Sequence, residues 1–113
     1  MALSIYGSTD TTSASFSFDA GSDSNRLLTV AIELYHETAC TITGVTYNSV
    51  SLTQKVAASH TYAGTRVVRS EQFYLEDPAS GSNTLTVSLS TTPEHISVVA
   101  VAWSDADSVG TNT

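Results

Sequence analysis

The sequence predicts an all-β fold, a single antiparallel β-sandwich of about seven or eight strands in a jelly-roll or immunoglobulin-like arrangement. Short segments in which apolar and polar residues alternate recur roughly every ten residues, with turn-forming residues between them. Serine and threonine supply 35 of the 113 residues, and only 13% of residues are charged. Threonine favours strands and serine favours turns, so this composition suits β-structure. A chain of this length holds one domain with one modest core.

The first thirteen residues are expected to form an arm and a linker ahead of the sandwich. Leu3, Ile5 and Tyr6 are apolar, whereas residues 7–13 are polar and have no hydrophobic period. We expect the arm to dock on an open strand edge, either of a neighbouring copy or of a partner protein. The sandwich is expected over residues 14–103, and residues 104–113 are expected to be a mobile polar tail.

Two strands are predicted in the first third of the sandwich. In residues 14–18 both phenylalanines fall on one face, and a turn follows. Residues 26–35 carry four aliphatic side chains on one face, and the other face is partly apolar as well. Such a pattern is typical of a central strand whose outer side is half covered.

A hairpin is predicted from residues 41–47 and 50–56. Asn48 and Ser49 between them are typical of a tight turn. Gly44 interrupts the alternation of the first strand, as a β-bulge does. Residues 57–64 have no period, so we expect an exposed loop there.

Residues 67–75 and 84–89 flank a turn-rich segment. They form either a β-hairpin or two successive strands of a sandwich. Neither face of residues 67–75 is purely apolar. Arg69 and Glu71 are therefore expected to pair across strands, at the solvent side of the sheet or at a subunit contact.

The last strand, predicted at residues 95–103, is apolar on both faces. It should lie deep in the fold or in an interface. Val99, Val101 and Trp103 share one of these faces. We expect Trp103 to be buried against the opposite sheet or against a neighbouring subunit, so that its removal costs on the order of 3–5 kcal/mol.

Charge and composition exclude several classes of partner. The formal net charge is -7, with only four Lys and Arg residues, which makes nucleic acid an unfavourable ligand. No apolar run approaches the roughly 20 residues that cross a bilayer, and the first residues do not look like a secretion signal. We expect an unanchored protein made in the cytoplasm. Cys40 is the only cysteine, expected to be a small buried residue and not a nucleophile.

No catalytic or metal motif stands out, so we expect neither an enzyme nor a bound cofactor. The three histidines, His36, His60 and His95, lack the spacing of metal ligands. Asp19 with Asp23, and Asp105 with Asp107, suit ordinary turns better than calcium loops.

Two further groups of residues leave alternatives open. Glu33 and Glu71 lie on strands that are candidates to be neighbours, either as a carboxylate pair for glycoside hydrolysis or, as we favour, as solvated or interfacial charge. The larger aromatic side chains form either a sugar-binding platform or, as we favour, the core and rim of the sandwich. These residues are Tyr35, Tyr47, Tyr62, Phe73, Tyr74 and Trp103.

Four blocks of the sequence resemble a β-sandwich module of tailed-phage structural proteins. In order they read NRLLTVAIEL, ITGVTYNSVSLTQ, EQFYLEDPASGSNTLTVSLS and VVAVAWSDAD, and they span residues 25–107. Gly44-Val45-Thr46-Tyr47 and Leu52 match the hairpin of that module. Its later block is matched by Tyr74-Leu75, Pro78, Gly81 and residues 84–87, with Phe73 where a tryptophan often stands. These motifs are structural and include no active-site residue.

The resemblance implies a virion structural protein, most simply a small capsid decoration (cement) protein that stabilises a phage head from outside. Its expected partners are the major capsid protein and further copies of itself, with a trimer favoured by analogy. The alternative is a carbohydrate-binding or adhesin module of a tail fibre or a bacterial surface protein. The candidate contact residues are Leu3, Ile5, Tyr6, Arg66, Arg69, Glu71, Val99, Val101 and Trp103.

Overall fold

The computed structural model describes residues 4–11, 14–22, 25–36, 40–62, 66–91 and 95–104, with side chains described except at residues 4–11, 36, 56, 58–62, 66 and 67. This part of the chain forms nine strands. They are β1 (Ser4–Thr11), β2 (Ser15–Asp19), β3 (Leu27–His36), β4 (Ile42–Tyr47), β5 (Val50–Ser51), β6 (Thr53–Tyr62), β7 (Arg66–Glu76), β8 (Ser82–Leu89) and β9 (His95–Ser104). The described residues include no helix, and hence none that could cross a membrane.

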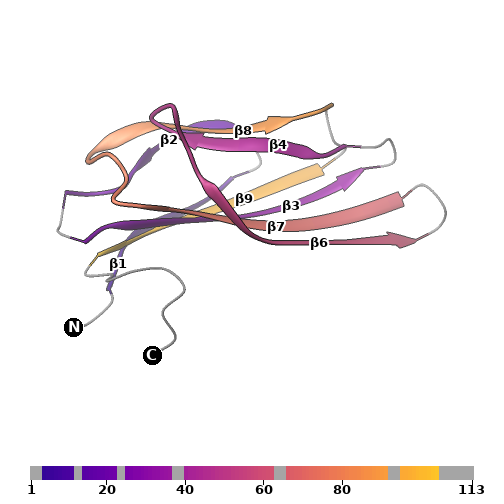
Figure 1. The fold of residues 1–113 in the computed structure, drawn as a ribbon, viewed down its shortest axis with the longest axis horizontal. Coiled ribbons are helices and arrows are strands. Elements are labelled where there is room, and N and C mark those ends of the chain that lie inside the picture. Colours follow the sequence, from indigo (N-terminus) through magenta and orange to yellow (C-terminus); the bar gives the residue numbers. More distant parts are fainter. Residues whose placement is uncertain are drawn as a thin grey trace.

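The strands form two antiparallel sheets that pack face to face (Figure 1). Sheet A has the order β1-β9-β3-β7-β6, and sheet B has the order β2-β8-β4-β5. The first four strands alternate between the sheets, as do β7, β8 and β9, an alternation typical of jelly-roll sandwiches. The predicted fold class, an antiparallel β-sandwich, is confirmed. Because β7 and β8 lie in different sheets, they are successive strands of the sandwich and not a hairpin.

The N-terminal segment differs from the predicted arm and linker. Ser4–Thr11 forms β1, which pairs along its whole length with β9 of the same chain. A register shift between Ile5 and Gly7 marks a bulge in this strand. The polar residues from Gly7 to Thr11 join the sheet because main-chain hydrogen bonds to β9 do not require apolar side chains.

The chain changes sheet at Leu52, which separates β5 in sheet B from β6 in sheet A. The predicted turn at Asn48-Ser49 and the bulge at Gly44 are both confirmed: the two turn residues have φ values of 51° and 65°, and the register of β4 shifts between Ile42 and Gly44. The predicted hairpin is correct only for Val50 and Ser51, since the next residues pair with β7. The loop predicted at residues 57–64 is wrong up to Tyr62, because β6 continues to that residue.

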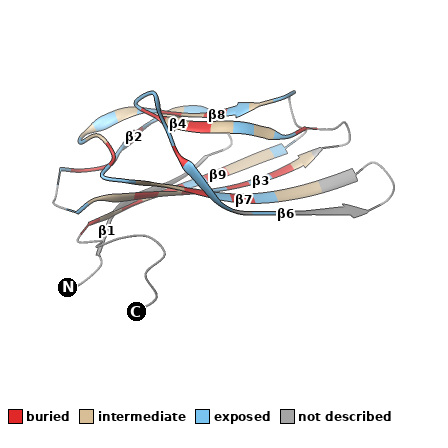
Figure 2. Cartoon of the chain, viewed as in Figure 1, coloured by how far each residue is buried: buried red, intermediate tan, exposed pale blue. Residues whose placement is uncertain are grey.

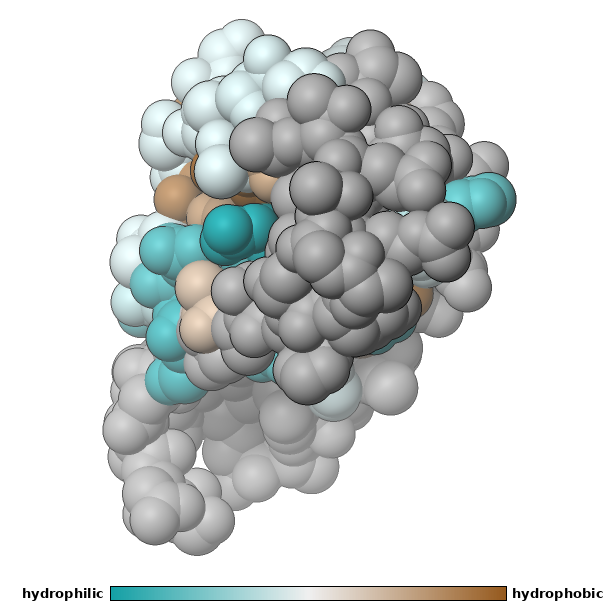
Figure 3. Space-filling model, turned by 90° about the vertical axis from the view of Figure 1, so that its right-hand side faces the viewer, coloured by the Kyte–Doolittle hydropathy of each residue, from teal (hydrophilic) through white to brown (hydrophobic). Residues whose placement is uncertain are grey.

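The core fills the space between the sheets (Figure 2). Buried side chains alternate with exposed or half-buried ones along strands that line the core, as in β9, where Val98, Ala100 and Ala102 point inward. In the end view of Figure 3, pale side chains of near-neutral hydropathy cover the upper layer, and brown apolar ones show only beneath them. The buried cluster comprises Phe18, Ala20, Leu28, Val30, Ile32, Val45, Tyr47, Leu52, Phe73, Leu85, Val87, Val98, Ala100 and Ala102.

Two polar contacts fasten the connections to this core. The hydroxyl of the fully buried Tyr47 lies 2.7 Å from the carbonyl oxygen of Phe18 and 2.8 Å from that of Gly81, and donates to them. The guanidinium of Arg26 donates from Nε and Nη2 to the carbonyl of Pro78, at 3.0 and 2.7 Å. The first contact holds the connection between β7 and β8 against the ends of β2 and β4, and the second holds it against the start of β3.

Candidate functional site

The face of sheet A that points away from sheet B is the candidate site, and we call it the outer face. On β9 the side chains of Val99, Val101 and Trp103 alternate with the buried ones and therefore lie on this face. The register places Leu27, Thr29 and Ala31 of β3 beside them. Val99 is 36% exposed, a large value for an aliphatic side chain in the middle of a sheet. A sheet face that meets water normally carries polar residues, so this apolar stretch calls for an explanation.

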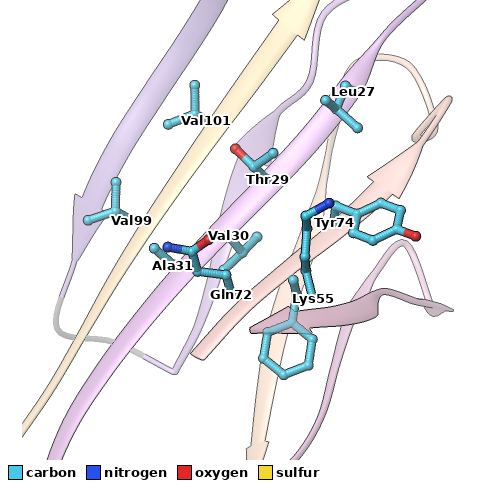
Figure 4. A pocket seen from close by; sticks show the side chains of 10 residues that line it. Leu27, Thr29, Val30, Ala31, Lys55, Gln72, Tyr74, Val99 and Val101 are labelled. Carbon is cyan, nitrogen blue, oxygen red and sulfur yellow. The ribbon is translucent and has the colours of Figure 1, made fainter. Parts of the chain in front are cut away.

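A hollow of about 370 Å³ lies on this face. Figure 4 shows Val99 and Val101 on one side of it and Lys55 and Tyr74 on the other. The amide of Gln72 belongs to the same lining. The hollow thus combines an apolar floor with an ammonium, an amide and a phenol, the groups with which proteins commonly hold a peptide or a sugar.

Trp103 lies at one end of the outer face and is half-buried. Its indole Nε1 donates to Thr29 Oγ1 at 2.9 Å. Burial against the opposite sheet, one of the two positions predicted for this ring, is wrong, because the ring lies on the outer face. Burial of Trp103 against a neighbouring subunit stays a prediction.

The other end of the outer face is more polar. A second hollow of about 380 Å³ is lined there by Glu33, Tyr35, His95 and Ser97, among others. The rings of Tyr35 and His95 lie 6.1 Å apart at an interplanar angle of 42°. The outer face therefore changes character along the strands, from aliphatic near Val101 to hydroxyl, imidazole and carboxylate near Tyr35.

Arg69 and Glu71 lie on the opposite, inward side of β7. Glu71 is only 2% exposed, accepts a hydrogen bond from Arg69 Nη1 at 3.1 Å and accepts another from the side-chain amide of Gln54. The two charges pair along one strand and not across strands or at the solvent side, so that prediction is wrong. The strand alternation that places them together also directs them both toward the interior.

The same geometry excludes the carboxylate pair suggested by Glu33 and Glu71. Glu33 is exposed on the outer face of β3, whereas Glu71 is buried on the inner side of β7. The register sets Glu71 opposite Ile32 and Glu33 opposite Ser70. The two carboxylates therefore lie on opposite sides of sheet A and cannot flank one substrate.

The chain matches no protein-family model, no curated protein and no solved structure.

Of the candidate contact residues, the structure brings Val99, Val101 and Trp103 together on the outer face. Ile5 belongs to β1 and lies opposite Trp103 in the register, while Tyr6 is at the bulge of that strand. Arg66 begins β7, and Leu3 lies outside the described residues.

The part that β3, β6 and β7 play in the outer face could not be predicted from the sequence. Leu27, Thr29 and Ala31 were visible only as a partly apolar second face of one strand. No sequence pattern assigns Lys55 and Gln72 to this face, because the sequence does not show which strands lie beside one another.

The other predicted groups have simpler positions. Cys40 is buried, as expected, and its thiol donates to the carbonyl of Thr91 at 3.4 Å. Asp19 forms the expected turn contact, accepting the N–H of Gly21 at 2.8 Å. Of the aromatic residues, Tyr47 and Phe73 belong to the core.

Tyr35, Tyr74 and Trp103 are half-buried on the outer face of sheet A. The core part of the favoured alternative is therefore correct for Tyr47 and Phe73, while a sugar-binding platform on the outer face stays open. Asp23, Asp105 and Asp107 lie outside the described residues, as do the side chains of His36, His60 and Tyr62. Within the described part, no group of three His, Cys, Asp or Glu residues lies close enough to hold a metal ion.

Proposed function

We propose that the chain is a virion structural protein, a capsid decoration (cement) protein that docks on the head of a tailed phage through the outer face of sheet A. The observation that carries this proposal is the exposed aliphatic stretch around Val99 and Val101, on the side of the sheet that the core does not use. The resemblance of the sequence blocks to phage sandwich modules supports the choice of partner. In this role the protein stabilises the head without chemistry of its own.

The size of the outer face supports a protein partner. Five strands about 4.8 Å apart, each about ten residues long at about 3.3 Å per residue, give a face of roughly 800 Å². A stable protein–protein interface takes about 800 Å² from each partner. The aliphatic centre and the polar end around Tyr35 and His95 also match the usual division of such an interface into an apolar core and a polar rim.

The test compares two Val→Asp variants that differ in position. Val99→Asp places a charge at the centre of the outer face. The control, Val50→Asp, makes the same substitution at a side chain that is 50% exposed at the start of β5. Each variant is sedimented with heads of the phage that encodes the chain, after the native protein has been removed from them.

We expect the wild-type chain and Val50→Asp to sediment with the heads and Val99→Asp to stay in solution. Equal binding by Val99→Asp would show that another surface docks on the head. No binding by the wild-type chain would refute the decoration role. Far-UV circular dichroism of both variants checks that they fold.

A carbohydrate-binding or adhesin module is the second candidate, and the hollow beside Val99 favours it. Tyr74, Gln72 and Lys55 line this hollow, and a ring with amide and ammonium groups in the same lining is suited to a sugar. A glycan array decides this. Binding that Tyr74→Ala abolishes, with no affinity for heads, would replace the first proposal by the second.

A further inference from the structure

Four strands form the outer edges of the two sheets, and they differ in how far they are open to pairing. Sheet B ends in β2 and β5, which have only five and two residues. Sheet A ends in β1, with eight residues, and β6, with ten. Short edge strands discourage pairing with another chain, whereas long ones invite it through their free N–H and C=O groups. The long edges of this sandwich are therefore both in sheet A, on opposite flanks.

The two flanks carry opposite charge. The strands β1 and β2 carry Asp10 and Asp19 and no Lys, Arg or His. Residues 38–70 include Lys55, Arg66 and Arg69 and no Asp or Glu, and they contain β4, β5, β6 and the first half of β7. Arg69 is paired with the neighbouring Glu71, which leaves Lys55 as the cation of this flank whose side chain the structure describes. Because β5 continues into β6 through Leu52, these two strands close the same flank.

The strand register places one charged residue of each flank at the same level along sheet A. Asp10 of β1 shares a row of sheet A with Val99, Ala31, Gln72 and Val56. The register of β6 shifts between Gln54 and Val56, so Lys55 is the extra residue of a bulge next to this row. Asp10 and Lys55 thus lie at the same level along the strands, on the two opposite edges.

We propose that copies of this chain associate head to tail, with the β6 edge of one copy pairing with the β1 edge of the next. Sheet A would then continue from copy to copy, and Asp10 of one copy would lie beside Lys55 of its neighbour. With no shift along the strands, Ser8–Thr11 would face Thr53–Ala57, the rows that the two strands share. Such a heterologous contact repeats, closing into a ring or continuing as a filament.

Strand direction and charge both distinguish this arrangement from a two-fold dimer. Every neighbouring pair in sheet A is antiparallel, so β1 and β6 run in the same direction. Head-to-tail repetition keeps that direction and gives a parallel β6–β1 pair, which is a stable if slightly weaker pairing. A two-fold dimer would pair β6 with β6 or β1 with β1, and so would join two edges of the same charge, with Lys55 opposite Lys55 or Asp10 opposite Asp10 when the two strands are centred on those residues. Like charges opposed in this way are unfavourable.

Charge-reversal variants test the proposal on the purified chain alone, so the result does not depend on what the outer face binds. Lys55→Glu and Asp10→Lys each place like charges at every head-to-tail contact. We expect each to weaken self-association about tenfold at low salt, as measured by sedimentation velocity over a range of concentrations. The double variant restores an opposite-charge pair and should associate like the wild type. An equal mixture of the two single variants should also associate, by alternating.

Two measurements serve as controls. Ser88→Glu, at an exposed position in the middle of sheet B, and Lys55→Gln both change the net charge by one unit, and only Lys55→Gln should weaken association. Circular dichroism checks that each variant folds. If the double variant does not fold, the mixture of Lys55→Glu and Asp10→Lys still tests whether restoring opposite charges restores association.

The proposal is overturned if the wild-type chain stays monomeric at all concentrations. It is also overturned if Lys55→Glu associates like the wild type, or if the mixture associates no better than the single variants. A two-fold dimer would leave the association of Lys55→Glu unchanged, because reversing both members of a like-charge pair leaves a like-charge pair.

Discussion

Replacing Tyr47 by Phe should destabilise the sandwich by about 1–2 kcal/mol, because the hydroxyl is buried and has two acceptors. It lies 2.7 Å from the Phe18 carbonyl and 2.8 Å from the Gly81 carbonyl. The Gly81 carbonyl also accepts the N–H of Ala20 at 3.1 Å, so it keeps a partner in the variant. The hydroxyl carries a single hydrogen for these two acceptors, so the cost corresponds to roughly one hydrogen bond and not two.

Urea unfolding measures this difference. With a slope of about 1.5 kcal/mol per molar urea, a loss of 1–2 kcal/mol lowers the midpoint by roughly 1 M. The matched control is Tyr74→Phe, which removes the same atom from a half-buried ring on the outer face. Its free energy of unfolding should change by no more than about 0.5 kcal/mol. Equal midpoints for the two variants would refute the role assigned to the Tyr47 hydroxyl.

Two other predictions concern single positions. Gly81 has a φ of 80° with open space around its missing side chain, so Gly81→Ala should cost about 1 kcal/mol through backbone conformation alone. Gly44→Ala, also in open space and without a positive φ, should be neutral or stabilising in the same urea assay, and equal losses would contradict this reasoning. Glu71→Gln deprives Arg69 of its carboxylate partner and should destabilise the protein by about 1–3 kcal/mol, less than a fully buried pair because the Arg69 side chain is 26% exposed. Glu33→Gln, at an exposed carboxylate, should leave the thermal midpoint nearly unchanged, and identical melting of the two variants would show that the Arg69–Glu71 pair adds nothing.

Strands with a clear two-residue period could be predicted from the sequence. The alternation in residues 26–35, 84–89 and 95–103 corresponds to β3, β8 and β9 because side chains on successive residues point to opposite faces. The double-sided apolar character of residues 95–103 also indicated a strand inside a sheet or an interface. The first reading is correct, because β9 lies between β1 and β3, and an interface on its outer face stays a prediction.

Features that depend on a partner strand could not be predicted. The segment from Val50 to Val56 alternates as one strand would, yet the chain leaves sheet B at Leu52 because the rest of it pairs with β7. Residues 7–11 and 57–62 have little hydrophobic pattern, and they are strands because the neighbouring backbone offers hydrogen bonds.

The candidate site shows the same limit. Its apolar residues on β9 were foreseen, whereas the hollow also depends on Lys55, Gln72 and Tyr74, which the register of three other strands brings alongside.

The position of β9 between β1 and β3 sets the order in which the protein can fold. Sheet A is incomplete until β9 is in place, because β1 pairs only with β9 and β3 otherwise has one open edge. Ser4 pairs with Ser104, so β1 cannot pair with its partner strand until β9 has left the ribosome. Closing such a long loop is slow compared with forming a local hairpin. The nascent chain therefore exposes the edge of β3 until β9 has been made, and β1 can join sheet A only once β9 is in place.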